Sequence, residues 1–283
     1  MNLSISADQP TIVPGRTGTQ TLTVANSGRP TTGESLVAFS TPAYTNIDRS
    51  VPLPAGCTLR YQNQDPTVPE VVNCRIPAGL AADRPVQLAI PLAVTERARL
   101  TGPALDAFSV VPTDGSPDTE SDFNDNWALS SVVMTRPTPA IPVGNRVGLH
   151  LTHDVPVLAA DGTATAILRY GNAGPAATVG PVQITFVTPF STTVDPDRPL
   201  PQGCEIVLAD RSLATPDVVV CTLPRLGTDQ ETALGLPLRS EDTGLAGRVA
   251  APALIAPACA DDVDTDQTDN MDDPGVLIPR RTT

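Results

Sequence analysis

A dense run of carboxylates near the end of this 283-residue sequence is its strongest candidate for chemistry. Residues 260 to 273 hold seven aspartates in fourteen positions, and charges this close repel one another unless a cation lies between them. Five residues have the spacing of calcium-loop ligands, at the first, third, fifth, ninth and twelfth positions: Asp262, Asp264, Asp266, Asn270 and Asp273. The segment therefore predicts calcium as the one candidate cofactor.

Two departures from the calcium-loop pattern favour a different interpretation of this segment. Gln267 occupies the sixth position, where the sharp turn requires Gly, and Asp273 is shorter than the bidentate Glu usually found at the twelfth. The alternative is a solvated turn in which Asp and Asn side chains bind their own backbone.

The other chemistry-bearing residues do not form a catalytic pattern. His150 and His153 are the only histidines, and on a strand their odd separation places them on opposite faces, which is unfavourable for shared metal binding. Nucleophile-elbow, phosphate-loop, zinc-protease and dinucleotide motifs are absent from the sequence. We therefore expect a protein that is not an enzyme, with no catalytic residues.

Two of the five cysteines end a word that the sequence spells twice, PLPAGC at residues 52–57 and PLPQGC at 199–204. Cys57 precedes Cys74, and Cys204 precedes Cys221, by the same 17 positions. In both places the two cysteines lie on short strand-like segments joined by a polar loop, so a disulfide between neighbouring strands is geometrically easy. The alternatives are reduced buried thiols and, less favoured, zinc, since two cysteines alone cannot complete a tetrahedral site.

Cys259 is the odd thiol. In an exported protein it predicts an intermolecular disulfide or a reactive thiol, and the alternative is a buried small residue in a loop.

The repeated word belongs to a longer duplication. Cys204 and Cys221 follow Cys57 and Cys74 by 147 positions each, and other matching segments differ from this offset by at most three residues. Three prolines crowd residues 134 to 146, where a stiff extended linker is expected. We predict one repeat at 1–136, a Pro-rich linker at 137–145 and a second repeat at 146–283, arranged as two rods end to end.

Each repeat has the pattern of short antiparallel strands. Val86, Leu88, Ile90, Leu92 and Val94 alternate with outward-facing residues, as in a half-buried strand. Further strands are expected at 19–26, 34–41, 57–61, 71–76, 107–111 and 128–134. With 31 prolines scattered along the chain and 3% aromatic residues, the predicted fold class is all-β, as two tandem immunoglobulin-like antiparallel β-sandwiches with aliphatic cores.

Charge and hydropathy limit the partners. The net charge of -13 would repel a phosphate backbone, so no nucleic acid is expected. No apolar stretch is long enough to span a bilayer. The first ten residues lack the features of a signal peptide, so the export route is open.

The ordered motifs resemble the bacterial conserved-repeat domain of secreted and cell-surface proteins, also called domain of unknown function 11. The motifs in the first repeat are Asn26 with Gly28, residues 54–57, residues 74–80 and residues 122–126; those in the second are Asn172 with Gly174, residues 201–204, residues 221–226 and residues 266–270. Met271 replaces Trp127, and the DDPG sequence that follows it makes the last strand of the second repeat doubtful. The resemblance implies immunoglobulin-like modules that act as spacers or adhesive segments, without catalytic residues.

We therefore expect an extracellular or cell-surface structural and interaction protein, a tandem β-sandwich spacer or adhesive module, with the cell wall among its expected sites of association. Its expected partners are proteins or copies of itself, bound through edge strands. The alternatives are a bacteriophage virion component and a calcium-dependent adhesin or carbohydrate-binding module.

Overall fold

The computed structural model describes residues 1–99, 102–135, 143–210, 214–240 and 245–279. These residues form an all-β protein whose only helical element is a 3-10 turn, η1 (Phe123–Asp125). The predicted all-β sandwich class is confirmed. None of the described helical segments is long and apolar enough to cross a membrane.

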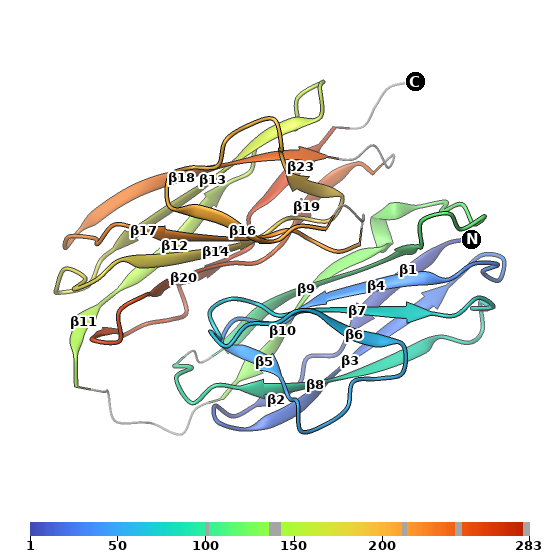
Figure 1. The fold of residues 1–283 in the computed structure, drawn as a ribbon, viewed down its shortest axis with the longest axis horizontal. Coiled ribbons are helices and arrows are strands. Elements are labelled where there is room, and N and C mark those ends of the chain that lie inside the picture. Colours follow the sequence, from blue (N-terminus) through green and yellow to red (C-terminus); the bar gives the residue numbers. More distant parts are fainter. Residues whose placement is uncertain (100–101, 136–142, 211–213, 241–244, 280–283) are drawn as a thin grey trace.

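The first half of the chain forms two sheets that pack face to face (Figure 1). The smaller has the order β1-β3-β8-β5, and the larger has the order β2-β10-β9-β4-β7-β6. The strands are β1 (Leu3–Ala7), β2 (Thr11–Ile12), β3 (Thr17–Asn26), β4 (Ser35–Ser40), β5 (Thr45–Ile47), β6 (Cys57–Tyr61), β7 (Val71–Ile76), β8 (Val86–Val94), β9 (Gly102–Pro112) and β10 (Trp127–Met134).

The second half repeats this order with interruptions. Its sheets are β12-β13-β18-β15 and β16-β17-β14-β20-β22, with two short pairs, β11-β21 and β19-β23. The strands are β11 (Asn145–Val147), β12 (Leu149–Asp154), β13 (Thr163–Asn172), β14 (Val182–Val187), β15 (Thr192–Val194), β16 (Cys204–Leu208), β17 (Val218–Leu223), β18 (Gln230–Ser240), β19 (Gly247–Ala250), β20 (Ala253–Pro257), β21 (Asp262–Asp264), β22 (Met271–Asp272) and β23 (Gly275–Ile278).

Alternating aliphatic residues place the strands as the sequence predicts. The segments expected at 57–61, 71–76 and 86–94 are β6, β7 and β8 without change. Pro91 lies inside β8 opposite Thr19 of β3, but its carbonyl accepts from Asp48 on the other side, so β3 does not require a donor from Pro91. On that other side, β5 pairs only with Leu92 to Val94. A missing N–H is tolerated where a strand is locally an edge.

Proline also explains why the second half is interrupted. The counterparts of the continuous strands β9 and β10 are each split in two, at residues 251–252 and 273–274. Pro252 and Pro274 lie at these breaks and cannot donate to a ladder. The last strand, which the DDPG sequence made doubtful, therefore exists as the two short pieces β22 and β23.

Both disulfides are present, each joining an outermost strand to its neighbour. Cys57 lies directly opposite Cys74 on β6 and β7, and Cys204 lies opposite Cys221 on β16 and β17. The Cα atoms are 3.9 Å apart in both pairs.

The expected end-to-end arrangement of the two halves is wrong. The larger sheets face each other side by side, and β1 begins toward the same end of the long axis at which β23 ends (Figure 1). Ala38 and Val111 belong to the apolar cluster of the second half, and Leu254 belongs to that of the first. The reason is that the outer faces of the larger sheets carry aliphatic residues, among them Ala38, Val111 and Leu254, which are buried where the halves pack together. Most of the predicted linker lies outside the described residues, and its last residue, Asn145, is already part of β11.

One buried polar pair interrupts the aliphatic core of the first half. The Nε2 atom of Gln20, on β3, donates to Asp106 Oδ2, on β9, over 2.8 Å. The remaining side-chain oxygens, Gln20 Oε1 and Asp106 Oδ1, are buried without a hydrogen-bond partner. Burial raises the pKa of Asp106 to about 7, against hydrogen bonds from Gln20 and Ser130 that lower it.

Reduction of the disulfides should weaken both edges. Closing a loop of this length stabilises a protein by about 3 kcal/mol in the chain-entropy account. We expect the double variant Cys57→Ser with Cys74→Ser to lose about this free energy of unfolding, measured by urea denaturation. The matched variant Cys204→Ser with Cys221→Ser should lose a similar amount, and Cys259→Ser should change little. An unchanged midpoint in both double variants would contradict the stabilising role.

Asp106 should make stability depend on pH. Since its folded pKa is raised from 3.8 to about 7, the folded state binds the proton more tightly, and stability falls as pH rises from about 4 to about 7. The full difference is about 4 kcal/mol. Relative to wild type, Asp106→Asn should therefore gain stability steadily over this range in denaturation at pH 4, 6 and 8. A gap between the two proteins that does not change with pH would refute the assignment.

Candidate functional site

The acidic segment lies along one end of the second sandwich. Asp262 and Asp264 are on β21, which pairs in parallel with β11. Asp262 is buried, and its carboxylate accepts from the backbone N–H groups of Val179 and Gly180 and from Asn145 Nδ2 over 2.7 to 3.3 Å. These bonds tie the segment before β14 to the end of the sheet.

Asp264 and Asn270 form a second buried group. Asp264 Oδ2 accepts from Asn270 Nδ2 over 2.9 Å and from the backbone N–H of Leu149 over 3.2 Å, where β12 begins. Burial raises the pKa of Asp264 to about 7, although these hydrogen bonds lower it. Nearby, Tyr44 of the first half is buried, and its burial, followed by the Asp264 carboxylate, raises the pKa of its phenol.

The first half has the same hydrogen bonds at the corresponding carboxylates. Asp118 accepts from the backbone N–H groups of Thr32 and Gly33, as Asp262 does from Val179 and Gly180. Glu120 accepts from the N–H of Leu3 and from Asn126, as Asp264 does from Leu149 and Asn270. Asp122 accepts from the N–H of Asn124, as Asp266 does from that of Thr268. These carboxylates are backbone acceptors at strand ends in both halves.

The structure does not gather the five predicted calcium ligands around one point. Asp264 and Asn270 touch, Asp262 binds the segment before β14, and Asp266 binds Thr268 in an exposed turn. Asp273 forms an ion pair with Arg248 over 3.0 Å. Calcium binding stays a prediction. The alternative, a solvated turn whose side chains bind their own backbone, fits Asp266. It is wrong for Asp262 and Asp264, which are buried and bind the backbone of distant segments.

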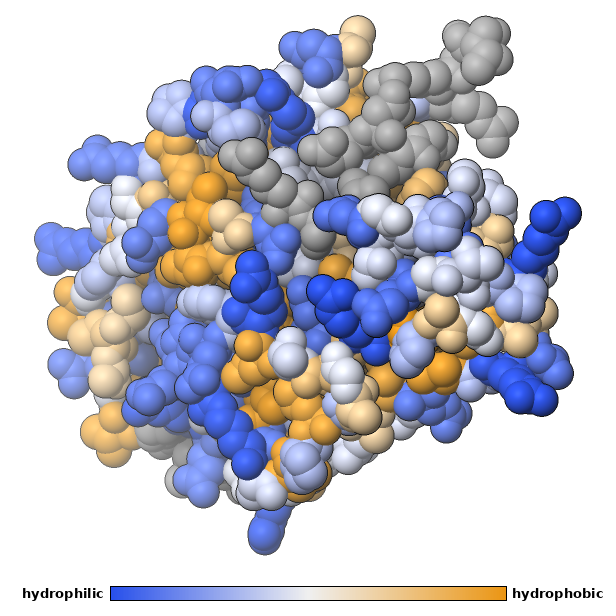
Figure 2. Space-filling model, turned by 45° about the vertical axis from the view of Figure 1, so that its right-hand side comes forward, coloured by the Kyte–Doolittle hydropathy of each residue, from blue (hydrophilic) through white to orange (hydrophobic). Residues whose placement is uncertain are grey.

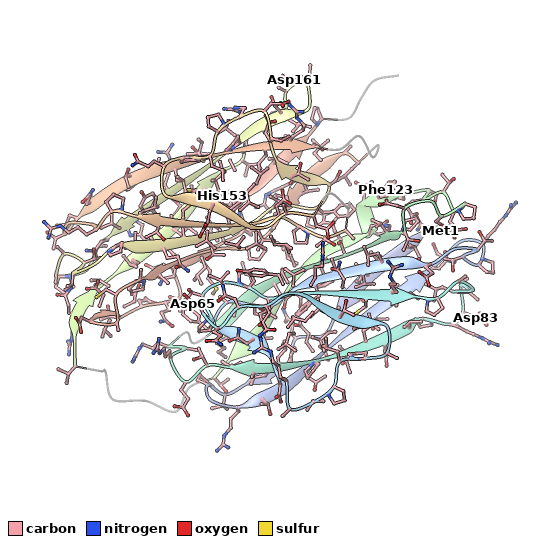
Figure 3. The ribbon with its side chains drawn as sticks, viewed as in Figure 1. Met1, Asp65, Asp83, Phe123, His153 and Asp161 are labelled. Atoms are coloured by element: carbon pink, nitrogen blue, oxygen red, sulfur yellow. A yellow bond between two sulfur atoms is a disulfide. The ribbon has the colours of Figure 1, made fainter. Side chains whose placement is uncertain are left out.

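A different cluster has metal-ligand spacing. In the part of the chain that the structure describes, the one such group is His153, Asp272 and Asp273, whose ligand atoms lie within 4.8 Å of one another. Figure 3 marks His153 in the second half. His153 Nδ1 lies 2.6 Å from Asp272 Oδ2, and a guanidinium nitrogen of Arg248 lies 3.3 Å from His153 Nε2. The guanidinium thus neutralises much of the negative charge that would attract a cation.

The sequence does not predict the group of His153, Asp272 and Asp273, because His153 is 119 positions from Asp272. His153 is on β12, Arg248 is on β19, and Asp272 is on β22. His150 and His153 point away from each other, as their spacing predicts, and only His153 joins the cluster.

Cys259 is the one free cysteine, and it is half-buried. It lies in the loop after β20. Its Cβ is so close to Gly180 that a Cβ added to this glycine would lie 2.6 Å from it. The intermolecular disulfide at this residue stays a prediction.

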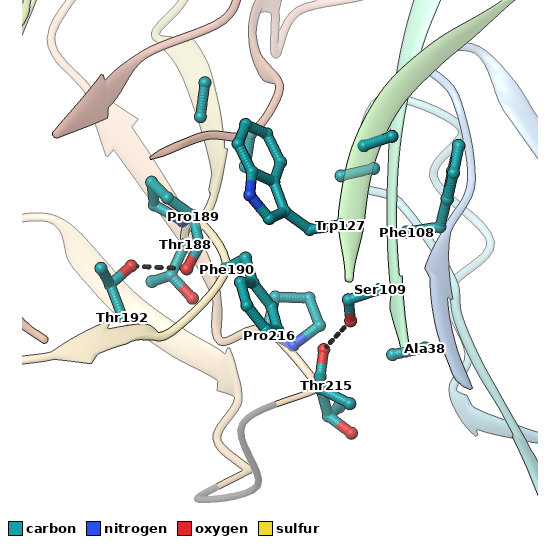
Figure 4. Close-up of a pocket in the computed structure, with 15 residues that line it drawn as sticks. Ala38, Phe108, Ser109, Trp127, Thr188, Pro189, Phe190, Thr192, Thr215 and Pro216 are labelled. Carbon is teal, nitrogen blue, oxygen red and sulfur yellow. Dashed lines mark hydrogen bonds between the residues drawn. The ribbon is translucent and has the colours of Figure 1, made fainter. Parts of the chain in front are cut away.

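Two clefts lie between the halves. The first is lined by Trp127 and Phe108 of the first half and by Phe190, Pro189 and Pro216 of the second (Figure 4). The second is lined by loop residues of the first half and by β14, β20 and Met271 of the second. The sequence does not predict either cleft, because the walls of each cleft are distant in the sequence.

Comparisons with known proteins give no family for the chain. No family model matches it, and a search of the curated proteins finds no match. The resemblance to domain of unknown function 11 therefore stays a prediction.

Solved structures show weak likeness. A cohesin module from a Clostridium perfringens family 33 glycoside hydrolase is 10% identical over 48% of this chain and 97% of its own, with a TM-score of 0.32. AvmM, which catalyses macrocyclization in alchivemycin A biosynthesis, is 16% identical over 50% and 93%, with a TM-score of 0.27. Escherichia coli alpha-2-macroglobulin activated by porcine elastase is 13% identical over 98% and 22%, with a TM-score of 0.25. These TM-scores are too low to support an argument about this chain.

The backbone-acceptor role of Asp262 can be separated from a calcium role. In EDTA, Asp262→Ala should lose about 1–3 kcal/mol of unfolding free energy, because two backbone N–H groups lose their acceptor. Asp118→Ala, the counterpart, should lose a similar amount, and Asp262→Asn should lose less because one oxygen remains. If Asp262 were instead a calcium ligand, Asp262→Ala would be as stable as wild type in EDTA, and calcium would raise the Tm of the wild type but not that of the variant.

Proposed function

We propose that this protein is a non-enzymatic interaction protein that works outside the cytoplasm and binds extended segments of protein partners along the edges of its larger sheets. The observation that carries the proposal is the position of the disulfides. In each half, the outermost strand of the larger sheet is covalently joined to its neighbour, while no strand of the described residues pairs with its other side.

The ladder determines which backbone groups of β16 are free. The N–H of Thr222 donates to Gly203 O over 2.8 Å, so the next pair, Cys204 with Cys221, is a non-hydrogen-bonded pair. Because the two kinds of pair alternate, Ile206 opposite Val219 is again non-hydrogen-bonded. Its N–H and C=O therefore point away from β17, toward the side where a partner strand would add.

The side chains of β16 leave this edge accessible. Ile206 is 39% exposed, which is unusual for an aliphatic side chain in this protein. On the face in Figure 2, hydrophilic side chains separate the apolar patches. An added strand would take its affinity from backbone hydrogen bonds and its specificity from alternate side chains.

Bulges limit the length of the edge. The register shifts after Ile206 in β16 and after Leu59 in β6. A bulge twists an edge strand and prevents unlimited pairing, which protects natural sheets from aggregation. The geometry supports a short peptide segment as the ligand, in preference to an open-ended array of copies.

The disulfides also support the proposed location. Structural disulfides persist in oxidising compartments and are rare where thiols are kept reduced. A location outside the cytoplasm, including the cell surface and the cell wall, agrees with two disulfides that each hold an edge strand.

The proposal can be tested with a phage-displayed library of random linear peptides selected on the oxidised protein. Binders should lose about tenfold in affinity for Ile206→Pro, because the variant lacks the outward N–H that a partner strand would use. The matched control, Ile206→Ala, removes the side chain but keeps the N–H and should retain most of the affinity. Binding is measured by biolayer interferometry.

The library could also select peptides that bind elsewhere, and hydrogen exchange separates the two cases. A peptide on this edge should protect the N–H of Ile206, whereas a peptide in a cleft should not. The proposal fails if no peptide binds, or if all binders tolerate Ile206→Pro.

A further inference from the structure

The two halves bury corresponding surfaces against each other. The first half contributes the outer face of β4, β7 and β9, and the second contributes that of β14, β17 and β20. Asn73 Nδ2, on β7, donates to Thr215 Oγ1 over 2.9 Å, and Gln183 Nε2, on β14, donates to Thr67 Oγ1 over 3.1 Å. In each case a strand of one half binds the loop that precedes β7 or β17 in the other.

These contacts have reciprocal partners. Where two residues meet across the interface, the corresponding residues of the opposite halves also lie together. Thr67 and Gln183 are hydrogen-bonded, and their counterparts, Ala214 and Leu36, pack in one apolar cluster. Asn73 binds Thr215, and their counterparts, Val220 and Val68, pack together in another cluster.

Reciprocity extends to the two ends of the interface. The backbone N–H of Arg99 donates to Gln267 Oε1 over 2.6 Å. The counterpart of Gln267 is Phe123, which packs against the apolar cluster of the second half. The hydroxyl of Ser109 donates to Ala214 O over 2.8 Å, and its counterpart Leu254 lines a cleft together with Thr67.

The two clefts are themselves counterparts. One wall of each cleft is a strand of a larger sheet. The opposite wall, from the other half, is formed by two loops, which precede β15 and β17 in the first cleft and β5 and β7 in the second. The residue at the start of β10 or β22 completes the lining. The matching lining residues are Ala38 and Thr185, Thr188 and Thr41, Phe190 and Ala43, Ala214 and Thr67, Pro216 and Pro69, and Trp127 and Met271.

We infer that the two halves are related by an approximate two-fold axis, so that the buried face of each half is a binding surface for a module of its own kind. An interface is isologous when both partners use the same surface, so that every contact recurs with the two partners exchanged. Such an interface closes on itself. The linker therefore only tethers the two halves, and their association persists without it.

Charge makes the pairing of unlike halves the favoured one. Arg60 Nε lies 3.0 Å from Asp210 Oδ2 across the interface. The counterparts of these residues, Val207 and Asn63, carry no charge, so only a first half against a second half forms this ion pair. Such differences select one partner among similar ones.

The inference is tested by cutting the tether in the folded protein. Residues 137–141 are replaced by the recognition sequence of a site-specific protease, and the oxidised protein is cleaved without denaturant. The cleaved material should elute in size-exclusion chromatography with light scattering at the 29.4 kDa mass of the intact chain. Separation of the unsubstituted halves after cleavage, at about half that mass, would overturn the inference.

Reciprocal variants test the symmetry. Thr67→Arg and Ala214→Arg each place a long charged side chain at counterpart positions in the interface loops, and each should weaken association of the cleaved halves by about tenfold or more. Thr19→Arg, at an exposed position on the outer sheet of the first half, is the matched control and should have no effect. An effect at only one of the two positions would also overturn the inference.

Loss of folding is distinguished from loss of association within the same experiment. Before cleavage, each variant must show the far-ultraviolet circular dichroism of the wild type, and after cleavage the separated halves must keep it. If Thr67→Arg or Ala214→Arg does not fold, Thr67→Glu and Ala214→Glu replace them. The outcome does not depend on whether β16 binds peptides.

Discussion

The burial of both faces of the larger sheets is the constraint on which the rest of the structure depends. Along β4, five of six residues are buried, where a sheet with one solvated face would show alternation. Val37 and Phe39 pack in the core of the first sandwich, whereas Ala38 packs against the second half. Since neither larger sheet can expose its outer face to water, the two sandwiches lie side by side, and the clefts between them follow from this arrangement.

Short strands create a second requirement, because many backbone N–H groups at strand ends have no ladder partner. Carboxylates and asparagine amides supply these partners. Asn26 and Asn172 each bridge the same kind of turn after β3 and β13, and Asp118 and Asp262 each bind two successive N–H groups before β4 and β14. Much of the acidic character of the loops is therefore structural. A sequence dense in aspartate imitates a calcium loop for this reason.

The disulfides act where hydrogen bonding is weakest. An outermost strand has one neighbour and can fray more readily than an inner strand, and a covalent bond to that neighbour limits this local opening. A glycine before Cys57 and before Cys204 allows the two strands to approach closely. Gly56 and Gly203 have φ values of 80° and 86°, and a Cβ at either position would collide with a carbonyl oxygen of the neighbouring strand. The repeated word PLP-x-GC thus encodes a turn and a cross-link together.

Local patterns in the sequence determined the strands, the repeat and the paired cysteines, because alternation, proline placement and fixed spacing act over a few residues. They predicted β6, β7 and β8 in full and identified the interrupted end of the second half. The tertiary structure alone decided how the halves meet and which side chains share a site. Trp127 with Phe190, and His153 with Arg248 and Asp272, come together only after the sheets have packed. The alternation along one strand indicates that a residue is buried, but it does not indicate which distant surface covers it.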